Sequence, residues 1–318
     1  MFTPASRGRA SVDTVTLGVG LAICASLLFA GQDSISKHLA DNYAPEFFLA
    51  IRFWAFAGFA LVFAAWRAPG GIRGALKAPR SIGLQMARGV LIITEIWIFT
   101  YALTYIQLAD LMAIFSSSPL LTTALAAIFL GEQVGWRRWL AVGAAVLGVA
   151  IILQPGAGIF GFGALLGLLS AFLYSCYTLL TRMTGRTDSI ESSLLYFALV
   201  GAVAMTPAGL SVWGDQNVAP MDWFWIFVLC CTGIGAHWAL TKALSWAPAS
   251  TLQPFSYIGV AGSILVAVAV LGERLEATTL LGVTLIVAAG LYALHRERIR
   301  AREARAAALA AGEAGRPV

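Results

Sequence analysis

Residues 106–153 read IQLADLMAIFSSSPLLTTALAAIFLGEQVGWRRWLAVGAAVLGVAIIL, two long apolar runs separated by the polar segment GEQVGWRR at 131–138. A helix needs about 20 mainly apolar residues to cross the hydrocarbon core of a bilayer, and each run has roughly that length. Because lipid offers no partners to backbone N–H and C=O groups, such a run crosses as an α-helix. The stretch therefore predicts two transmembrane helices joined by a short polar connection.

The same pattern extends over the whole chain. Of the 318 residues, 59% are hydrophobic and 12% are charged, whereas a soluble domain has about 25% charged residues. This composition excludes a soluble enzyme, a nucleic-acid-binding module and a disordered protein. It predicts an all-α polytopic membrane protein with ten transmembrane helices, at 14–38, 45–66, 81–105, 106–130, 135–154, 161–182, 190–213, 222–246, 248–271 and 276–294.

The basic residues lie mainly on one side of these spans. Sixteen of the 21 Lys and Arg fall in the N-terminal segment, the second, fourth and sixth connections and the tail after residue 294. The opposite face receives only Lys37 and Arg274, and the other three lie within spans. Connections rich in Lys and Arg stay in the cytoplasm. The distribution predicts a protein of the cytoplasmic (inner) membrane with both termini cytoplasmic.

The two halves of the chain resemble one another. At an offset of 145 residues the first span matches the sixth, with Phe29 on Tyr174, and at an offset of 141 the Leu-Gly-Glu at 130–132 falls on that at 271–273. Each half holds five spans, an odd number, so the second copy enters the membrane inverted, as in transporters that work by alternating access. We expect repeats at 14–154 and 161–294 and a cytoplasmic basic tail at 295–318. Both Gly-Glu pairs are interpreted as helix ends.

A family resemblance follows from motifs between Ala102 and Pro155. They are Ala109-Asp110, Ser118-Pro119-Leu120, Leu130-Gly131-Glu132, Trp136-Arg137-Arg138-Trp139-Leu140 and Gln154-Pro155-Gly156. This run resembles the EamA domain of the drug/metabolite transporter superfamily, and the second half carries a weaker copy. The resemblance covers residues 14–294 and implies a ten-helix fold of two inverted five-helix repeats around a central cavity. The stretch Phe29-Ala30-Gly31-Gln32-Asp33-Ser34, with Lys37 and Arg52, is similar to the branch that contains S-adenosylmethionine and riboflavin transporters.

Ionisable residues within apolar spans are costly, so they usually line a cavity or contact each other. Asp33 is interpreted either as the structural partner of Arg52 or as a substrate ligand. Lys37 lies one turn from Asp33, which allows an ion pair, although extension toward the lipid headgroups is favoured. Arg52 lies too deep to reach the headgroups and needs a partner.

Glu95, near the middle of the third span, is the strongest single candidate for substrate binding. It is interpreted either as a group that exchanges a proton or binds a cationic substrate, or as half of a static ion pair with Arg88 or Lys242. Further along the same helix, Trp97 and Tyr101 are expected either to stack on an aromatic substrate or to belong to an interfacial aromatic belt.

Two other spans contribute candidates. Ser116 and Ser118 precede Pro119, which lacks an N–H and leaves a helical carbonyl without its donor. The site should therefore face protein or a wet cavity, or the serines serve close packing. His237 is interpreted as a packing residue or a proton carrier. Substrate-binding roles are also expected for Gln253 and Tyr257 in the ninth span.

These features predict a secondary transporter of a small organic metabolite, similar to S-adenosylmethionine, riboflavin or an amino acid, that works by alternating access. A broad-specificity drug/metabolite exporter and a lipid or lipid-precursor flippase stay open as alternatives. The sequence has no Walker-type phosphate loop, nucleophile elbow or metal-binding histidine pair, so an enzyme is not expected. The expected partners are the substrate and the lipid bilayer, with a coupling proton and a homodimer left open. No nucleic acid, metal or cofactor is expected, and the four cysteines lie within apolar runs.

Overall fold

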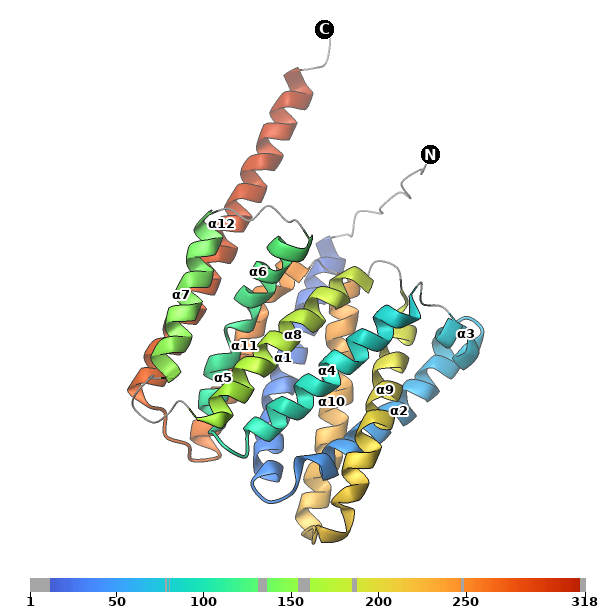
Figure 1. Cartoon of the computed structure of the whole chain (residues 1–318). Helices are drawn as coiled ribbons and strands as arrows, with labels where there is room; N and C mark the ends of the chain where they lie inside the picture. The colour runs from blue at the N-terminus through green and yellow to red at the C-terminus, as the bar shows by residue number, and fades with distance from the viewer. Residues whose placement is uncertain are drawn as a thin grey trace.

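The computed structural model of the protein describes residues 12–77, 79, 81–130, 136–153, 161–184, 188–246 and 249–314. Its helices are α1 (Val12–Ala40), α2 (Pro45–Arg67), α3 (Gly71–Lys77), α4 (Ile82–Ala102), α5 (Leu108–Phe115), α6 (Ser118–Leu130), α7 (Trp136–Leu153), α8 (Phe162–Thr184), α9 (Ile190–Ser211), α10 (Pro220–Trp246), α11 (Ala249–Ala269) and α12 (Ala277–Ala314), with a 3-10 turn, Trp213–Asp215, before α10. Figure 1 shows them as one bundle.

The bundle is that of an all-α polytopic membrane protein. In the described residues, seven helical segments are long and apolar enough to cross a membrane, and three shorter apolar segments are Trp139–Leu153, Phe255–Ala269 and Ala277–Ala293. Each of the ten segments overlaps one of the ten predicted spans. Successive spans run in opposite directions, so the start of α1 and the end of α12 lie at the same end of the bundle (Figure 1).

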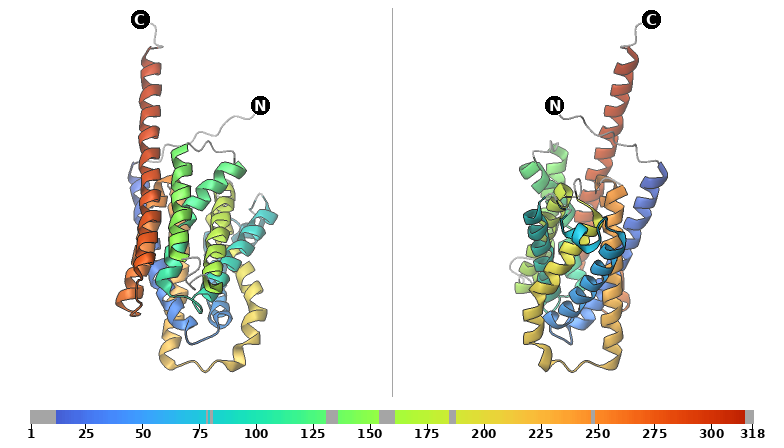
Figure 2. Two further views of the ribbon diagram at one scale, coloured as in Figure 1. Left: turned by 60° about the vertical axis from the view of Figure 1, so that its left-hand side comes forward. Right: turned by 90° about the vertical axis from the view of Figure 1, so that its right-hand side faces the viewer.

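Two spans differ from the prediction. The span expected at 106–130 consists of two helices, α5 and α6, which are interrupted at Ser116 and Ser117. Pro119 lies in the first turn of α6. N–H groups of the first turn have no partner within the helix, so the N–H that proline lacks costs α6 no hydrogen bond. The span expected at 276–294 does not end there, because α12 continues as one helix to Ala314 and projects beyond the bundle (Figure 2).

The helix pairing is preserved when the two halves of the chain are exchanged. α1 packs on α10 and α11, and its counterpart α8 packs on α4 and on α5 with α6. The remaining major pairs, α2 with α9 and α7 with α12, join counterparts directly. This is the arrangement that two inverted repeats related by a pseudo-two-fold axis produce.

Glycines bring α7 and α12 into backbone contact. A Cβ atom on Gly148 would lie 2.9 Å from the carbonyl oxygen of Gly282, and one on Gly282 would lie 2.6 Å from that of Gly148. Small residues allow membrane helices to approach closely and gain packing contacts that lipid does not supply. This crossing holds the fifth and tenth spans together at one side of the bundle.

The second Gly-Glu pair links the repeats. Gly272 has a φ of +71° just after α11, the left-handed conformation that ends a helix. The carboxylate of Glu273 accepts hydrogen bonds from the backbone N–H groups of Leu108 and Ala109, both at 2.9 Å. It therefore caps the first turn of α5 in the other repeat. The first Gly-Glu pair, at 131–132, lies outside the described residues.

Candidate functional site

A cavity of about 550 Å³ lies in the middle of the bundle. Its described lining residues come from every spanning helix except α7 and α12, which pair with each other at the side. Six of the predicted substrate-binding residues line it, namely Asp33, Arg52, Glu95, Ser116, Ser118 and His237. Tertiary packing thus brings together residues from both repeats.

Glu95 is held by a hydroxyl group. Its side chain is 4% exposed, and Ser170 Oγ on α8 donates a hydrogen bond of 2.8 Å to its Oε1 atom. The alternative of an ion pair with Arg88 or Lys242 is wrong. Arg88 donates to the carbonyl oxygen of Ser193 instead, at 2.8 Å, and the Lys242 Nζ atom lies 4.8 Å from the centre of a tryptophan ring.

Asp33 is also held by a serine. Ser263 Oγ on α11 donates a hydrogen bond of 3.2 Å to Asp33 Oδ2. The ion pair considered between Asp33 and Lys37 is not formed, because Lys37 extends toward the end of α1. There its Nζ atom lies 2.7 Å from Asp41 Oδ1 and donates to the carbonyl oxygen of Leu103, at 2.9 Å, beyond the last turn of α4.

Arg52 lines the same cavity as these two carboxylates and forms no direct ion pair among the described residues. Its side chain is 3% exposed, and its Nη2 atom donates a hydrogen bond of 3.0 Å to Gln32 Oε1. Asp33 and Glu95 act on it electrostatically, yet no ion pair joins any of the three within the described part of the chain. Gly233 on α10 provides the space, because a Cβ atom there would lie 3.0 Å from Arg52 Nε.

The interruption between α5 and α6 faces the cavity. Ser116 and Ser118 line it, together with Pro119. The hydroxyl of Ser116 donates a hydrogen bond of 2.6 Å to the carbonyl oxygen of Ala113, and that of Ser117 donates one of 2.7 Å to the carbonyl oxygen of Ile114. The carbonyl oxygen of Ile114 also accepts a hydrogen bond from the backbone N–H of Ser117, at 3.1 Å, so both serine hydroxyls bond within the last turn of α5. The break therefore places polar backbone beside the cavity, as expected for an interrupted membrane helix.

Three predicted aromatic residues lie outside the cavity. Trp97 is 38% exposed, and its Nε1 atom donates a hydrogen bond of 2.9 Å to Glu46 Oε1. Tyr101 accepts one from the hydroxyl of Tyr105 at 3.2 Å, at the end of α4. Tyr257 is buried against Gly290 on α12. Helical rotation turns all three away from the centre. The side chain of Gln253 lies outside the described structure.

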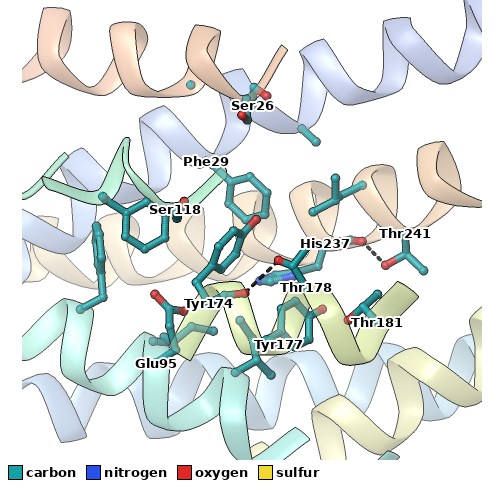
Figure 3. A pocket seen from close by; sticks show the side chains of 18 of the residues that line it. Ser26, Phe29, Glu95, Ser118, Tyr174, Tyr177, Thr178, Thr181, His237 and Thr241 are labelled. Carbon is teal, nitrogen blue, oxygen red and sulfur yellow. Dashed lines mark hydrogen bonds between the residues drawn. The ribbon is translucent and has the colours of Figure 1, made fainter. Parts of the chain in front are cut away.

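The aromatic residues that line the cavity were not predicted. They are Phe29, Phe99, Phe115, Tyr174 and Tyr177, and Figure 3 shows Phe29, Tyr174 and Tyr177 beside Glu95 and His237. The sequence repeat could have indicated two of them, because the offset of 145 residues pairs Phe29 with Tyr174. His237 is surrounded by rings, with centroids 5.2 Å from Phe29 and 4.9 Å from Phe197.

The chain is similar to known proteins along most of its length. The chain is 25% identical over 288 residues to a protein named S-adenosylmethionine uptake transporter from Rickettsia bellii, over 91% of this chain and 97% of that protein. It is 27% identical over 291 residues to one named riboflavin transporter from Vibrio cholerae, over 89% and 94%. A solved crystal structure superposes with a TM-score of 0.60 at 20% identity, covering 89% of this chain and 99% of that one, and shares the fold.

The sequence profile of the EamA-like transporter family matches residues 16–154 and 161–294. These two segments include every span and nearly all described cavity residues. The protein therefore belongs to the EamA-like transporter family and is a multi-pass membrane transporter of a small molecule rather than an enzyme.

Proposed function

We propose that the protein is a secondary transporter that carries a small organic metabolite, similar to S-adenosylmethionine or riboflavin, across the cytoplasmic membrane by alternating access. One observation carries this proposal. Asp33, Arg52 and Glu95 line one cavity, and each forms its hydrogen bond with a neutral side chain. Charged groups that already neutralise each other would gain little from a substrate, whereas none of these three has an oppositely charged hydrogen-bond partner among the described residues.

The cavity reaches one end of the bundle. Near the end that holds the start of α1 and the end of α12, it is lined by Asp188 and Ser189, and Ser189 is exposed. At the other end its lining residues Ser36 and Thr100 are 3% and 2% exposed. With both termini in the cytoplasm, as the basic connections predict, this form of the transporter is open to the cytoplasm and closed to the outside.

Transport in proteoliposomes tests the proposal. We expect vesicles that contain the purified full chain to accumulate radiolabelled S-adenosylmethionine or riboflavin above protein-free vesicles, with saturation and with competition by the unlabelled compound. Imposing and then collapsing a pH gradient tests whether a proton is coupled to the movement. Vesicles that take up neither compound, although they contain correctly folded protein, would contradict this substrate class.

A further inference from the structure

Two aromatic side chains face the cavity from equivalent places in the two repeats. Phe29 on α1 and Tyr174 on α8 are related by the offset of 145 residues, and both line the cavity. Glu95 on α4 and His237 on α10 line the cavity from the third span of each repeat. Each repeat thus supplies aromatic rings and ionisable groups to the cavity, but the ionisable groups differ between the repeats. The cavity is therefore built symmetrically and is chemically asymmetric.

Both rings are held in place by other aromatic groups and not by each other. The centroid of Phe29 lies 5.2 Å from that of His237, with the ring planes at 84°. The centroid of Tyr174 lies 5.1 Å from that of Phe115 and 6.1 Å from that of Tyr177. Within the described residues, Phe29 and Tyr174 form no ring contact with one another, although Figure 3 shows them pointing into the same space. Both rings line the same cavity.

Polar groups with unused hydrogen-bonding capacity surround this space. Glu95 receives one bond, at Oε1, so its Oε2 atom is available. The hydroxyl of Tyr174 and the ring nitrogens of His237 have no hydrogen-bond partner among the described contacts. Both side chains line the cavity. A flat ring with donors and acceptors at its edge would satisfy such groups, and its faces would gain stacking contacts from the aromatic walls.

We propose that the planar heteroaromatic group of the substrate binds between Phe29 and Tyr174, and that a cationic group of the same substrate binds at the Glu95 carboxylate. This inference rests on the proposed function and adds to it which chemical groups are recognised and by which residues. Phe29 and Tyr174 then select for the ring, and Glu95 selects for the charge.

Ligand binding to the full chain in lipid nanodiscs, measured by calorimetry, tests this assignment. Three probes separate the two groups: S-adenosylmethionine has a ring and a cation, riboflavin has a ring without a cation, and S-methylmethionine has a cation without a heteroaromatic ring. Tyr174→Leu and Phe29→Leu remove the walls, whereas Tyr174→Phe keeps the ring. Phe172→Leu is the matched control, because Phe172 lies on the same helix, is 46% exposed and is not part of the cavity lining.

We expect the wild type to bind at least one planar probe, and S-methylmethionine at least tenfold more weakly. Tyr174→Leu and Phe29→Leu should each weaken binding of the planar probe about tenfold, as expected for loss of one stacking partner. Phe172→Leu should retain it, and Tyr174→Phe, which keeps the ring, should weaken it less than Tyr174→Leu does. If S-adenosylmethionine binds, Glu95→Gln should weaken it, while riboflavin binding should change less than threefold in that variant.

The possible failures are distinguishable. If neither planar probe binds the wild type, the proposed function and this inference fail together. If a planar probe binds and both leucine variants bind it as the wild type does, only this inference fails. Equal binding of S-methylmethionine and S-adenosylmethionine would also overturn it, because the ring would then contribute nothing. Melting curves of each variant without ligand exclude a loss of folding, and Phe29→Leu tests the same slot if Tyr174→Leu does not fold.

Discussion

Glu95 is a buried ionisable residue at a position where an apolar side chain would stabilise the bundle more. Removing an ionised carboxylate from water costs several kcal/mol even after the protein relaxes, and one hydrogen bond to a charged group returns only about 1.5–3 kcal/mol. Its partner in the bundle is the hydroxyl of Ser170. A side chain chosen for stability alone would be apolar here, so we attribute its presence to substrate recognition.

Replacement of Glu95 by Gln should therefore impair transport and leave the fold intact. The amide is nearly isosteric and can still bond to Ser170, so the melting temperature should not fall. Uptake of a cationic substrate such as S-adenosylmethionine into proteoliposomes should fall about tenfold or more, which corresponds to a loss of about 1.4 kcal/mol. Glu46→Gln is the control, because Glu46 bonds to Trp97 outside the cavity. Uptake by Glu95→Gln equal to that of the wild type would remove Glu95 from the site.

A second prediction concerns the space beside Arg52. In Gly233→Ala the new Cβ atom would lie 3.0 Å from Arg52 Nε and 3.1 Å from Gln32 Oε1, so this buried pair must shift. We expect uptake to fall at least fivefold, equivalent to about 1 kcal/mol. In the control Gly235→Ala the Cβ atom would meet Leu28 Cδ1 at 3.4 Å, an ordinary contact. Equal uptake by the two variants would show that the position of Arg52 does not matter.

At the scale of elements, the fourth span is divided where polar backbone is needed. Its two halves, α5 and α6, meet at Ser116 and Ser117 beside the cavity. The N-terminus of α5 is capped by the carboxylate of Glu273, which belongs to the other repeat. A negative charge is favourable at a helix N-terminus, because the helix dipole and the free N–H groups both attract it. One short connection thus fixes α5 relative to α11 and α12.

Loss of this cap should destabilise the protein measurably. Glu273→Ala removes both hydrogen bonds to the first turn of α5, and we expect the free energy of unfolding to fall by about 1–2 kcal/mol. Thermal unfolding of the purified protein in detergent measures this. Glu276→Ala, in the same connection but exposed, should change the melting temperature much less. Equal effects of the two variants would show that the cap contributes nothing.

At the scale of the whole molecule, the inverted pairing relates the two ends of the bundle to each other. The cavity lies between halves that exchange under the pseudo-two-fold axis, so the proposed alternating-access mechanism predicts that a form open at one end has a counterpart open at the other. In this structure the lining residues Ser189 and Ser36 mark the open and the closed end. The connection between α9 and α10 lies at the closed end of the bundle (Figure 2).

Labelling of single cysteines tests both the orientation and the open end. In a cysteine-free background, Ser189→Cys should react with a membrane-impermeant maleimide only after the cells are permeabilised. Asp215→Cys, exposed in the turn before α10, should react in intact cells. Ser36→Cys should react least of the three in this form. Labelling of Ser189→Cys and Asp215→Cys from the same side would contradict the ten-span arrangement.

The sequence by itself determined the number and approximate limits of the spans, because the length of an apolar run is a local property. It also placed Asp33, Arg52 and Glu95 within spans, but it predicted one continuous span at 106–130 and not the break between α5 and α6. Only the tertiary structure decided their partners. Glu95 and Ser170 are 75 residues apart in the chain and Asp33 and Ser263 are 230 apart, and such contacts depend on how each helix is rotated about its axis. The same rotation turned Trp97, Tyr101 and Tyr257 away from the cavity and brought Phe29 and Tyr174 to it. Hydrophobicity does not tell these two groups apart, because lipid is as apolar as the interior of the bundle.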